Sequence, residues 1–266
     1  MTDIKTIGFI GAGGVNSRFA RLSANAGFKV LISNSRGPES LRDIVSELGP
    51  RAKAVSIEQV NAADILVYSV PFGNLDKIPV KPFAGKTIID TTNYYALRDG
   101  NISALDNREL TSSEYVQRHF KDSRVVKALH NMDLFHIDNG ADRKKEQDKP
   151  WAVPMTGDND DAKKQVTEFI KAIGFEAVDC GSLKESWKIE ANTPVYLWPY
   201  VGKIPDGLDK EEAMYWYKQD KSATVTRQDL LRLVEQATQD IPVGGHVENA
   251  PKPWMDWILY WMNGSQ

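Results

Sequence analysis

The stretch I-G-F-I-G-A-G-G-V-N, residues 7–16, decides the fold, because it passes from a β-rich run through glycines into a helical pattern. In the dinucleotide-binding fingerprint, one glycine makes the tight turn, a second lets the backbone approach the pyrophosphate, and the helix N-terminus faces the negative charge. Gly11 and Gly13 fit these roles, whereas the third position, usually Gly or Ala, is Asn16. Any tight turn can require glycine, so the strand-to-helix context carries the prediction of a nucleotide site.

The same alternation of short apolar runs and helical patterns continues over the first 180 residues. It predicts an α/β fold of the Rossmann type, with a doubly wound, mostly parallel sheet. The expected strands are 5–10, 28–33, 52–55, 65–71, 87–91, 124–129, 152–156 and 176–179, and the expected helices are 15–26, 39–48 and 159–173. Asp158 is a plausible cap for the last helix. The polar run 138–149 is interpreted as a solvated loop.

The character of the chain changes near residue 181, where strand signals end. We therefore expect a nucleotide-binding domain over residues 1–181 and a smaller, mainly helical region over 182–266. Six of the seven Trp residues lie at positions 187–261. The aromatic run 253–262 is interpreted as core and homodimer interface, since apolar residues at helical spacing usually pack. A lid over a flat substrate and a membrane-surface helix are the alternatives.

Composition limits the classes of function. The chain has 266 residues, 41% of them hydrophobic and 26% charged, with a net charge of −3, as in an ordinary globular protein with no nucleic-acid partner. The single cysteine, Cys180, excludes an intramolecular disulfide and a multi-cysteine metal site, and we expect its thiol to be buried and inert. No metal-ligand spacing, leader or membrane-length apolar run is found, so we expect a cytoplasmic protein.

The end of the second expected strand indicates which cofactor binds. An Asp or Glu there would bind the adenosine ribose hydroxyls and repel a 2′-phosphate. This chain has Asn34, Ser35 and Arg36 instead, which offer two neutral hydrogen-bonding groups and a guanidinium suited to a phosphate. The pattern predicts NADP rather than NAD, and a polar loop with an exposed Arg is the alternative.

Three further strand ends lie where ligands bind in open α/β sheets. The segments S-V-P-F at 69–72 and D-T-T-N at 90–93 are positioned to touch the nicotinamide and its ribose, although strand-ending turns would look the same. The third segment, V-V-K-A-L-H-N at 125–131, ends near His130, a candidate proton donor or shuttle whose alternative role is a structural hydrogen bond. Lys127 is expected to lie on the flank.

Taken in order, these segments resemble the deazaflavin-dependent NADP oxidoreductases, which move hydride between NADP(H) and an 8-hydroxy-5-deazaflavin coenzyme. The motifs are I-G-F-I-G-A-G-G, S-N-S-R, V-V-K-A-L-H-N, T-G-D-N-D-D-A-K-K (156–164), G-F-E-A-V-D-C-G-S-L (174–183) and K-I-E-A-N-T-P (188–194). They cover about the first 200 residues. The cytosolic reductase domain of membrane ferric reductases is similar too.

The resemblance implies roles for individual residues. It implies phosphate contacts at the glycine turn, 2′-phosphate contacts after the second strand, and nicotinamide contacts at the later strand ends, with His130 as the catalytic candidate. With Asn16 added from the fingerprint, and Ser69 and Asn93 from the strand ends, the expected cofactor-binding residues are Gly11, Gly13, Gly14, Val15, Asn16, Asn34, Ser35, Arg36, Ser69, Val70, Pro71 and Asn93. Members of the family tend to end soon after the segment matching 188–194, where this chain runs on.

Two classes of function follow. The first is an oxidoreductase that transfers hydride from NADPH to a small organic acceptor: deazaflavin by resemblance, otherwise a flavin, quinone, imine or carbonyl compound. The second is a non-catalytic NADP(H)-binding module that reports redox state to a partner, because Rossmann folds host both. An enzyme needs a pocket beside the nicotinamide, and a sensor needs a surface that differs between the two cofactor states.

Overall fold

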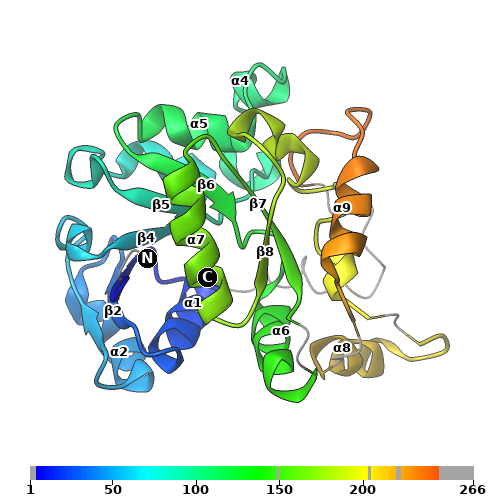
Figure 1. Ribbon diagram of the computed structural model, residues 1–266, viewed down its shortest axis with the longest axis horizontal. Coiled ribbons are helices and arrows are strands. Elements are labelled where there is room, and N and C mark those ends of the chain that lie inside the picture. Colours follow the sequence, from blue (N-terminus) through cyan, green and yellow to red (C-terminus); the bar gives the residue numbers. More distant parts are fainter. Residues whose placement is uncertain (1–3, 148–149, 203–204, 220–222, 246–266) are drawn as a thin grey trace.

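A single eight-stranded sheet organises the computed structural model, which describes residues 4–147, 150–202, 205–219 and 223–245 (Figure 1). The strand order is β3-β2-β1-β4-β5-β6-β7-β8, and β7 runs antiparallel to β6 whereas the other neighbouring pairs are parallel. The strands are β1 Thr6–Ile10, β2 Lys29–Ser33, β3 Ala52–Ala54, β4 Ile65–Tyr68, β5 Thr87–Asp90, β6 Arg124–Ala128, β7 Ala152–Gly157 and β8 Glu176–Asp179. The predicted Rossmann-type α/β fold is confirmed.

Helices cover both faces of the sheet, as the alternating pattern predicted. The α-helices are α1 Gly14–Asn25, α2 Arg42–Leu48, α3 Ala96–Asp99, α4 Ser103–Asp106, α5 Ser112–His119, α6 Leu134–Gln147, α7 Asp160–Ala172, α8 Lys210–Gln219 and α9 Arg227–Glu235. Short 3-10 helices lie at Pro38–Leu41, Gln59–Ala62, Phe72–Lys77, Lys81–Phe83, Leu183–Lys188 and Trp198–Tyr200. No helix in the described ranges is both long and apolar enough to cross a bilayer.

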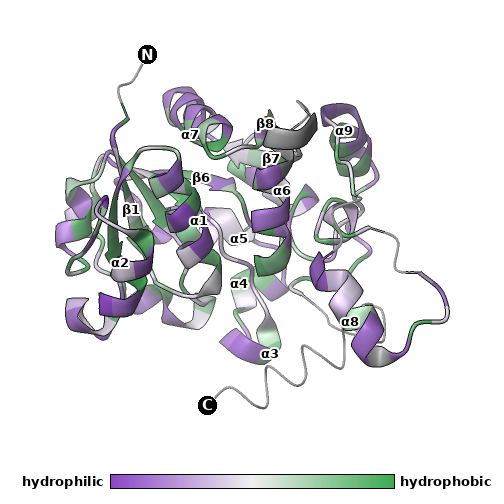
Figure 2. Ribbon diagram, turned by 90° about the horizontal axis from the view of Figure 1, so that it is seen from below, coloured by the Kyte–Doolittle hydropathy of each residue, from purple (hydrophilic) through white to green (hydrophobic). Residues whose placement is uncertain are grey.

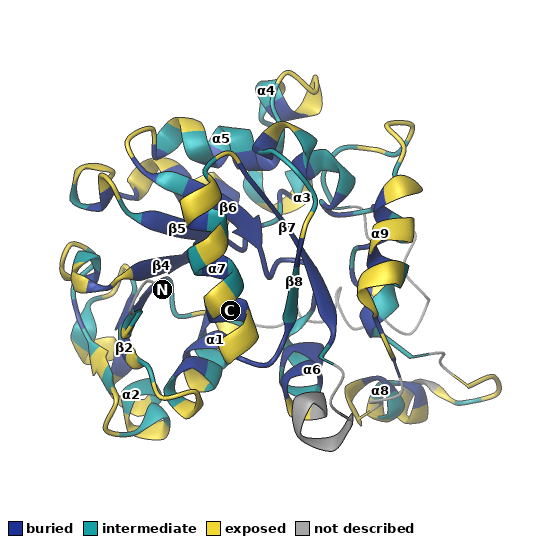
Figure 3. Ribbon diagram, viewed as in Figure 1, coloured by how far each residue is buried: buried dark blue, intermediate teal, exposed yellow. Residues whose placement is uncertain are grey.

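The central strands are buried on both faces, which explains their continuous apolar runs. Phe9 of β1 packs into one core with Phe19 of α1 and Phe169 of α7, whereas the next residue, Ile10, packs into a second core with Val116 of α5. This alternation follows from the period of two along a strand. Figures 2 and 3 show the result, with apolar, buried strands inside and polar, exposed outer faces on the helices.

The interpretation of residues 138–149 as a loop is wrong over most of its length, because α6 continues to Gln147. The charged residues of this run belong to a helix, and Gly140 allows the helix to approach β7 and β8 closely. A Cβ atom on Gly140 would come within 2.4 Å of the Trp151 ring. A polar sequence alone does not distinguish a loop from a helix. The cap of α7 is also Asn159 rather than Asp158, since its side chain accepts from Ala162 N.

The region after residue 181 packs against the outer edge of the sheet and shares its core. Tyr200 and Leu230 are fully buried in the same cluster as the strands, and the Tyr200 hydroxyl donates to Ala152 O of β7 at 2.8 Å. In addition, the indole Nε1 of Trp151 donates a hydrogen bond to Ala223 O at 2.9 Å. The division near residue 181 stays a prediction, and the aromatic run 253–262 lies outside the described residues.

Candidate functional site: the carboxyl edge of the sheet

The turn between β1 and α1 is shaped to admit a phosphate. Gly11 has φ +97°, and a Cβ atom there would come within 2.4 Å of Ser69 O, so only glycine fits. Gly13 has no atom within 4 Å of its Cβ position, which leaves its outer side open. Helix α1 begins at Gly14 and has no acidic residue in its first turn. Its N-terminal N–H groups thus face a space suited to the pyrophosphate of a dinucleotide.

Asn16 stands where the fingerprint usually has its third glycine, and its side chain points into the protein. Its side chain is fully buried, and Nδ2 donates to Ile10 O at 3.1 Å and to Gly11 O at 2.9 Å. The amide therefore fixes the end of β1 and the glycine turn from inside. In this position Asn16 shapes the cradle, while Gly13 and Gly14 present exposed backbone.

Of the three residues after β2, one forms hydrogen bonds within the loop and two are exposed to solvent. The Asn34 side chain is used within the loop, where Oδ1 accepts from Arg36 N at 3.0 Å and Nδ2 donates to Ser40 Oγ at 2.9 Å. Ser35 and Arg36 are exposed. Arg36 forms no ion pair with a carboxylate within the described ranges. Its guanidinium is therefore available to bind a phosphate group.

The ends of β4 and β5 border the same turn. Ser69 N continues the pairing to Ile10 O at 3.0 Å, and Val70 lies beside Gly11. Pro71 lies exposed at the rim of this part of the edge, and it has no backbone N–H to donate. Asn93, after β5, donates from Nδ2 to His130 O at 2.8 Å, which ties the loop after β5 to the end of β6.

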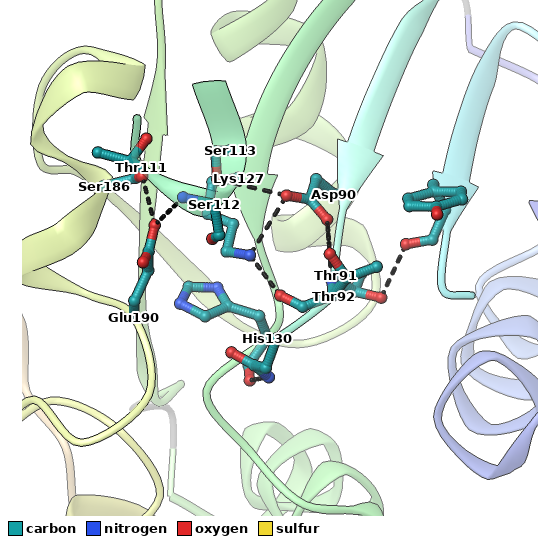
Figure 4. A network of polar contacts seen from close by, with 12 residues as sticks. Asp90, Thr91, Thr92, Thr111, Ser112, Ser113, Lys127, His130, Ser186 and Glu190 are labelled. Atoms are coloured by element: carbon teal, nitrogen blue, oxygen red, sulfur yellow. Dashed lines mark hydrogen bonds and ion pairs between the residues drawn. The ribbon is translucent and has the colours of Figure 1, made fainter. Parts of the chain in front are cut away.

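Beneath this edge lies a buried charged network (Figure 4). The prediction that Lys127 lies on the flank is wrong, because its side chain is fully buried and its ammonium pairs with Asp90 Oδ2 at 3.2 Å. The two residues are direct neighbours in the β5–β6 register. Asp90 also accepts from Thr92 N at 2.9 Å, from Thr92 Oγ1 at 2.6 Å and from Ser113 Oγ at 3.3 Å. Lys127 donates to Thr92 O as well, so the network holds the backbone that leads to Asn93.

His130 is buried at the end of β6, and its Nε2 lies 2.6 Å from Ile189 O. A carbonyl oxygen only accepts, so Nε2 carries the proton and Nδ1 presents a lone pair. Burial, together with the nearby Lys127 charge, lowers the His130 pKa well below its ordinary value. The ring is therefore neutral near pH 7, and its Nδ1 is able to accept a hydrogen bond but not to donate one. Nδ1 has no partner among the described residues. The catalytic role of His130 stays a prediction.

Two other sequence expectations concern reactive groups. Cys180 is half-buried, and burial raises the pKa of its thiol to about 12, so it stays protonated as expected for an inert cysteine. No group of His, Cys, Asp and Glu side chains in the part of the chain that the structure describes is arranged to hold a metal ion.

Comparison with known proteins agrees with the motifs. Residues 6–94 match the model of a family described as NADP oxidoreductase, coenzyme F420-dependent, and coenzyme F420 is a deazaflavin. The F420-dependent NADP reductase of Methanocaldococcus jannaschii is 27% identical over 168 residues, which cover 59% of this chain and 72% of that protein. Metalloreductase STEAP3 of Rattus norvegicus is 27% identical over 202 residues, which cover 75% of this chain but only 38% of the rat protein.

Structural similarity covers most of the chain. A hypothetical protein, SMa0349, from Sinorhizobium meliloti superimposes with a TM-score of 0.65 at 28% identity, over 74% of this chain and 95% of that one. The matches agree with the expected class of NADP-dependent oxidoreductase and with NADP as its cofactor. The resemblance read from the motifs is confirmed: over residues 6–94 this chain is similar to the F420-dependent NADP oxidoreductases.

Proposed function

We propose that this protein is a reductase that transfers hydride from NADPH to an organic acceptor bound beside His130. The observation that carries the proposal is the open glycine turn, where Gly11 has room for no side chain and Gly13 faces free space at the start of α1. The bound cofactor supplies the hydride from C4 of its nicotinamide. The chain supplies orientation, with Arg36 for the 2′-phosphate and Asn93 and His130 at the nicotinamide end.

The catalytic contribution expected of the chain is positional. The Asp90–Lys127 network holds the backbone of Thr92, and Asn93 donates to His130 O, so the backbone expected to border a bound nicotinamide is fixed in place. Holding two reactants at near-attack distance accounts for a large part of many enzymatic rate enhancements. The acceptor is an 8-hydroxy-5-deazaflavin by resemblance, and a flavin, a quinone, an imine or a carbonyl compound are the other members of the class.

The experiment is stopped-flow mixing of NADPH-loaded protein with one acceptor of each kind: an 8-hydroxy-5-deazaflavin, FMN, menadione, 1-pyrroline and cyclohexanone. We expect at least one to accelerate the loss of the 340 nm absorbance of NADPH. If none does so while NADPH binds, the non-catalytic sensor would be favoured.

The cofactor assignment is tested with Arg36→Ala, measured by calorimetric titration with NADPH and NADH. Charge-assisted hydrogen bonds contribute about 1.5–3 kcal/mol, so we expect NADPH binding to weaken by about 10- to 100-fold and NADH binding to stay unchanged. Arg42→Ala is the matched control, because Arg42 is also exposed nearby but pairs with Glu39. An equal loss for both cofactors would contradict the role of Arg36.

A further inference from the structure

Two tyrosine hydroxyls meet where the loops after β5 and β6 come together. Tyr95 follows Asn93 by two residues, and its hydroxyl contacts the hydroxyl of Tyr196, which comes from the region after residue 181. The residue after Tyr196, Leu197, donates its N–H to Asn131 O at 2.9 Å. Since Asn93 bonds to His130 O, both tyrosines are tied to the same strand end as His130.

The backbone at this point is held in unfavourable conformations. Leu129, just before His130, has φ +58°, and Leu197 has φ +60° with ψ −64°. Trp198 N closes a bond to Tyr196 O at 2.7 Å, so Leu197 is the centre of a γ-turn of the rare, strained kind. Strain at non-glycine residues persists only where the surroundings enforce it, and it gathers at functional sites. Here the two strained residues are the direct neighbours of His130 and Tyr196.

The chemistry of the pair is that of a proton donor. Burial raises the pKa of Tyr95, and burial together with Tyr95 raises that of Tyr196 well above its ordinary value, so both hydroxyls are protonated near pH 7. Both residues are half-buried. The Arg98 guanidinium lies 4.9 Å from the centre of the Tyr95 ring, where a cation stabilises negative charge that develops on the phenol. His130, which is neutral, has no proton to give through Nδ1.

We propose that the Tyr95–Tyr196 pair is the proton donor of the reaction, and that the acceptor is a compound reduced at a polar double bond, a ketone or an imine. This inference rests on the proposed function. The acceptor carbon takes hydride from the reduced nicotinamide, which becomes NADP⁺, while the heteroatom takes a proton from one tyrosine hydroxyl. The O–H bond of that tyrosine breaks as the new O–H or N–H bond forms. The second tyrosine passes on its own proton and is reprotonated by water.

The test uses Tyr95→Phe, Tyr196→Phe and the double variant, with cyclohexanone and 1-pyrroline as acceptors. General acid catalysis contributes about 10²- to 10⁴-fold, so we expect each single variant to lower kcat about 100-fold. Because the hydroxyls act in series, the double variant should lose no more than the worse single variant. Tyr215→Phe is the matched control, since Tyr215 lies on α8 and is 72% exposed. Unchanged kcat, or losses that multiply in the double variant, would overturn the relay.

A binding measurement separates this inference from the proposed function. Protein saturated with NADP⁺ is titrated with cyclohexanone, which needs no turnover. Loss of one hydrogen bond costs about 0.5–1.5 kcal/mol, so the phenylalanine variant that removes the direct donor should bind the ketone about 2- to 10-fold more weakly, with NADP⁺ affinity unchanged. Wild-type protein that reduces only flavin, quinone or deazaflavin would keep the proposed function and overturn the assignment of a ketone or imine. Wild-type protein that reduces no acceptor would overturn both.

Discussion

Replacing Lys127 by Met tests whether the buried ion pair supports the edge of the sheet. Lys127 and Asp90 are both fully buried, and Lys127 supplies one of the four hydrogen bonds that reach the Asp90 carboxylate. The variant leaves that carboxyl group out of water and without the only cation in the network. Removing one partner of a buried pair costs about 3–5 kcal/mol. The free energy of unfolding of a domain is about 5–15 kcal/mol in total, so Lys127→Met should lose about a fifth of it or more.

The assay is urea unfolding at pH 7, followed by fluorescence. Adding Asp90→Asn to Lys127→Met removes the remaining charge, and the asparagine oxygen still accepts from Thr92, so we expect the double variant to recover most of the loss. Lys164→Met is the control, because Lys164 and Asp161 form an exposed pair at 3.4 Å, worth about 0–1 kcal/mol. A loss below about 1 kcal/mol for Lys127→Met, or a double variant less stable than the single one, would refute this account of the network.

Two further predictions concern stability. Gly140→Ala places a methyl group within 2.4 Å of the Trp151 ring, so overpacking of about 1–3 kcal/mol should outweigh the gain in helix propensity and lower the melting temperature. Gly13→Ala, which meets no atom within 4 Å, should leave the melting temperature nearly unchanged, and an equal shift for both would contradict the packing argument. The folded-state pKa of His130 lies below its unfolded value of about 6.5, so the unfolded chain takes up the proton first as the pH falls. Stability should therefore decrease as the pH falls below about 6.5, and His130→Gln should flatten this dependence of the urea midpoint; an identical slope in both proteins would place the effect elsewhere.

The sequence by itself determined the sheet, the glycine turn and the cofactor class. Continuous apolar runs such as Ile65–Tyr68 predict buried parallel strands because neither face of such a strand meets water, and Gly11 predicts a tight turn because of its missing Cβ. These signals are local. The helix over 134–147 was missed because a polar sequence is typical of a loop as well as of a helix, and its packing partners, Trp151 and Phe175, come later in the chain.

Only the tertiary structure decided which polar groups meet at the carboxyl edge. Asp90 and Lys127 become partners through the pairing register of β5 with β6, and nothing in either segment alone predicts the pairing. Tyr95 and Tyr196 lie 101 positions apart in the sequence and come together because the chain after β8 returns to the end of β6. A sequence fixes what each side chain can do, whereas long-range packing fixes which side chains share a site and how far their pKa values move.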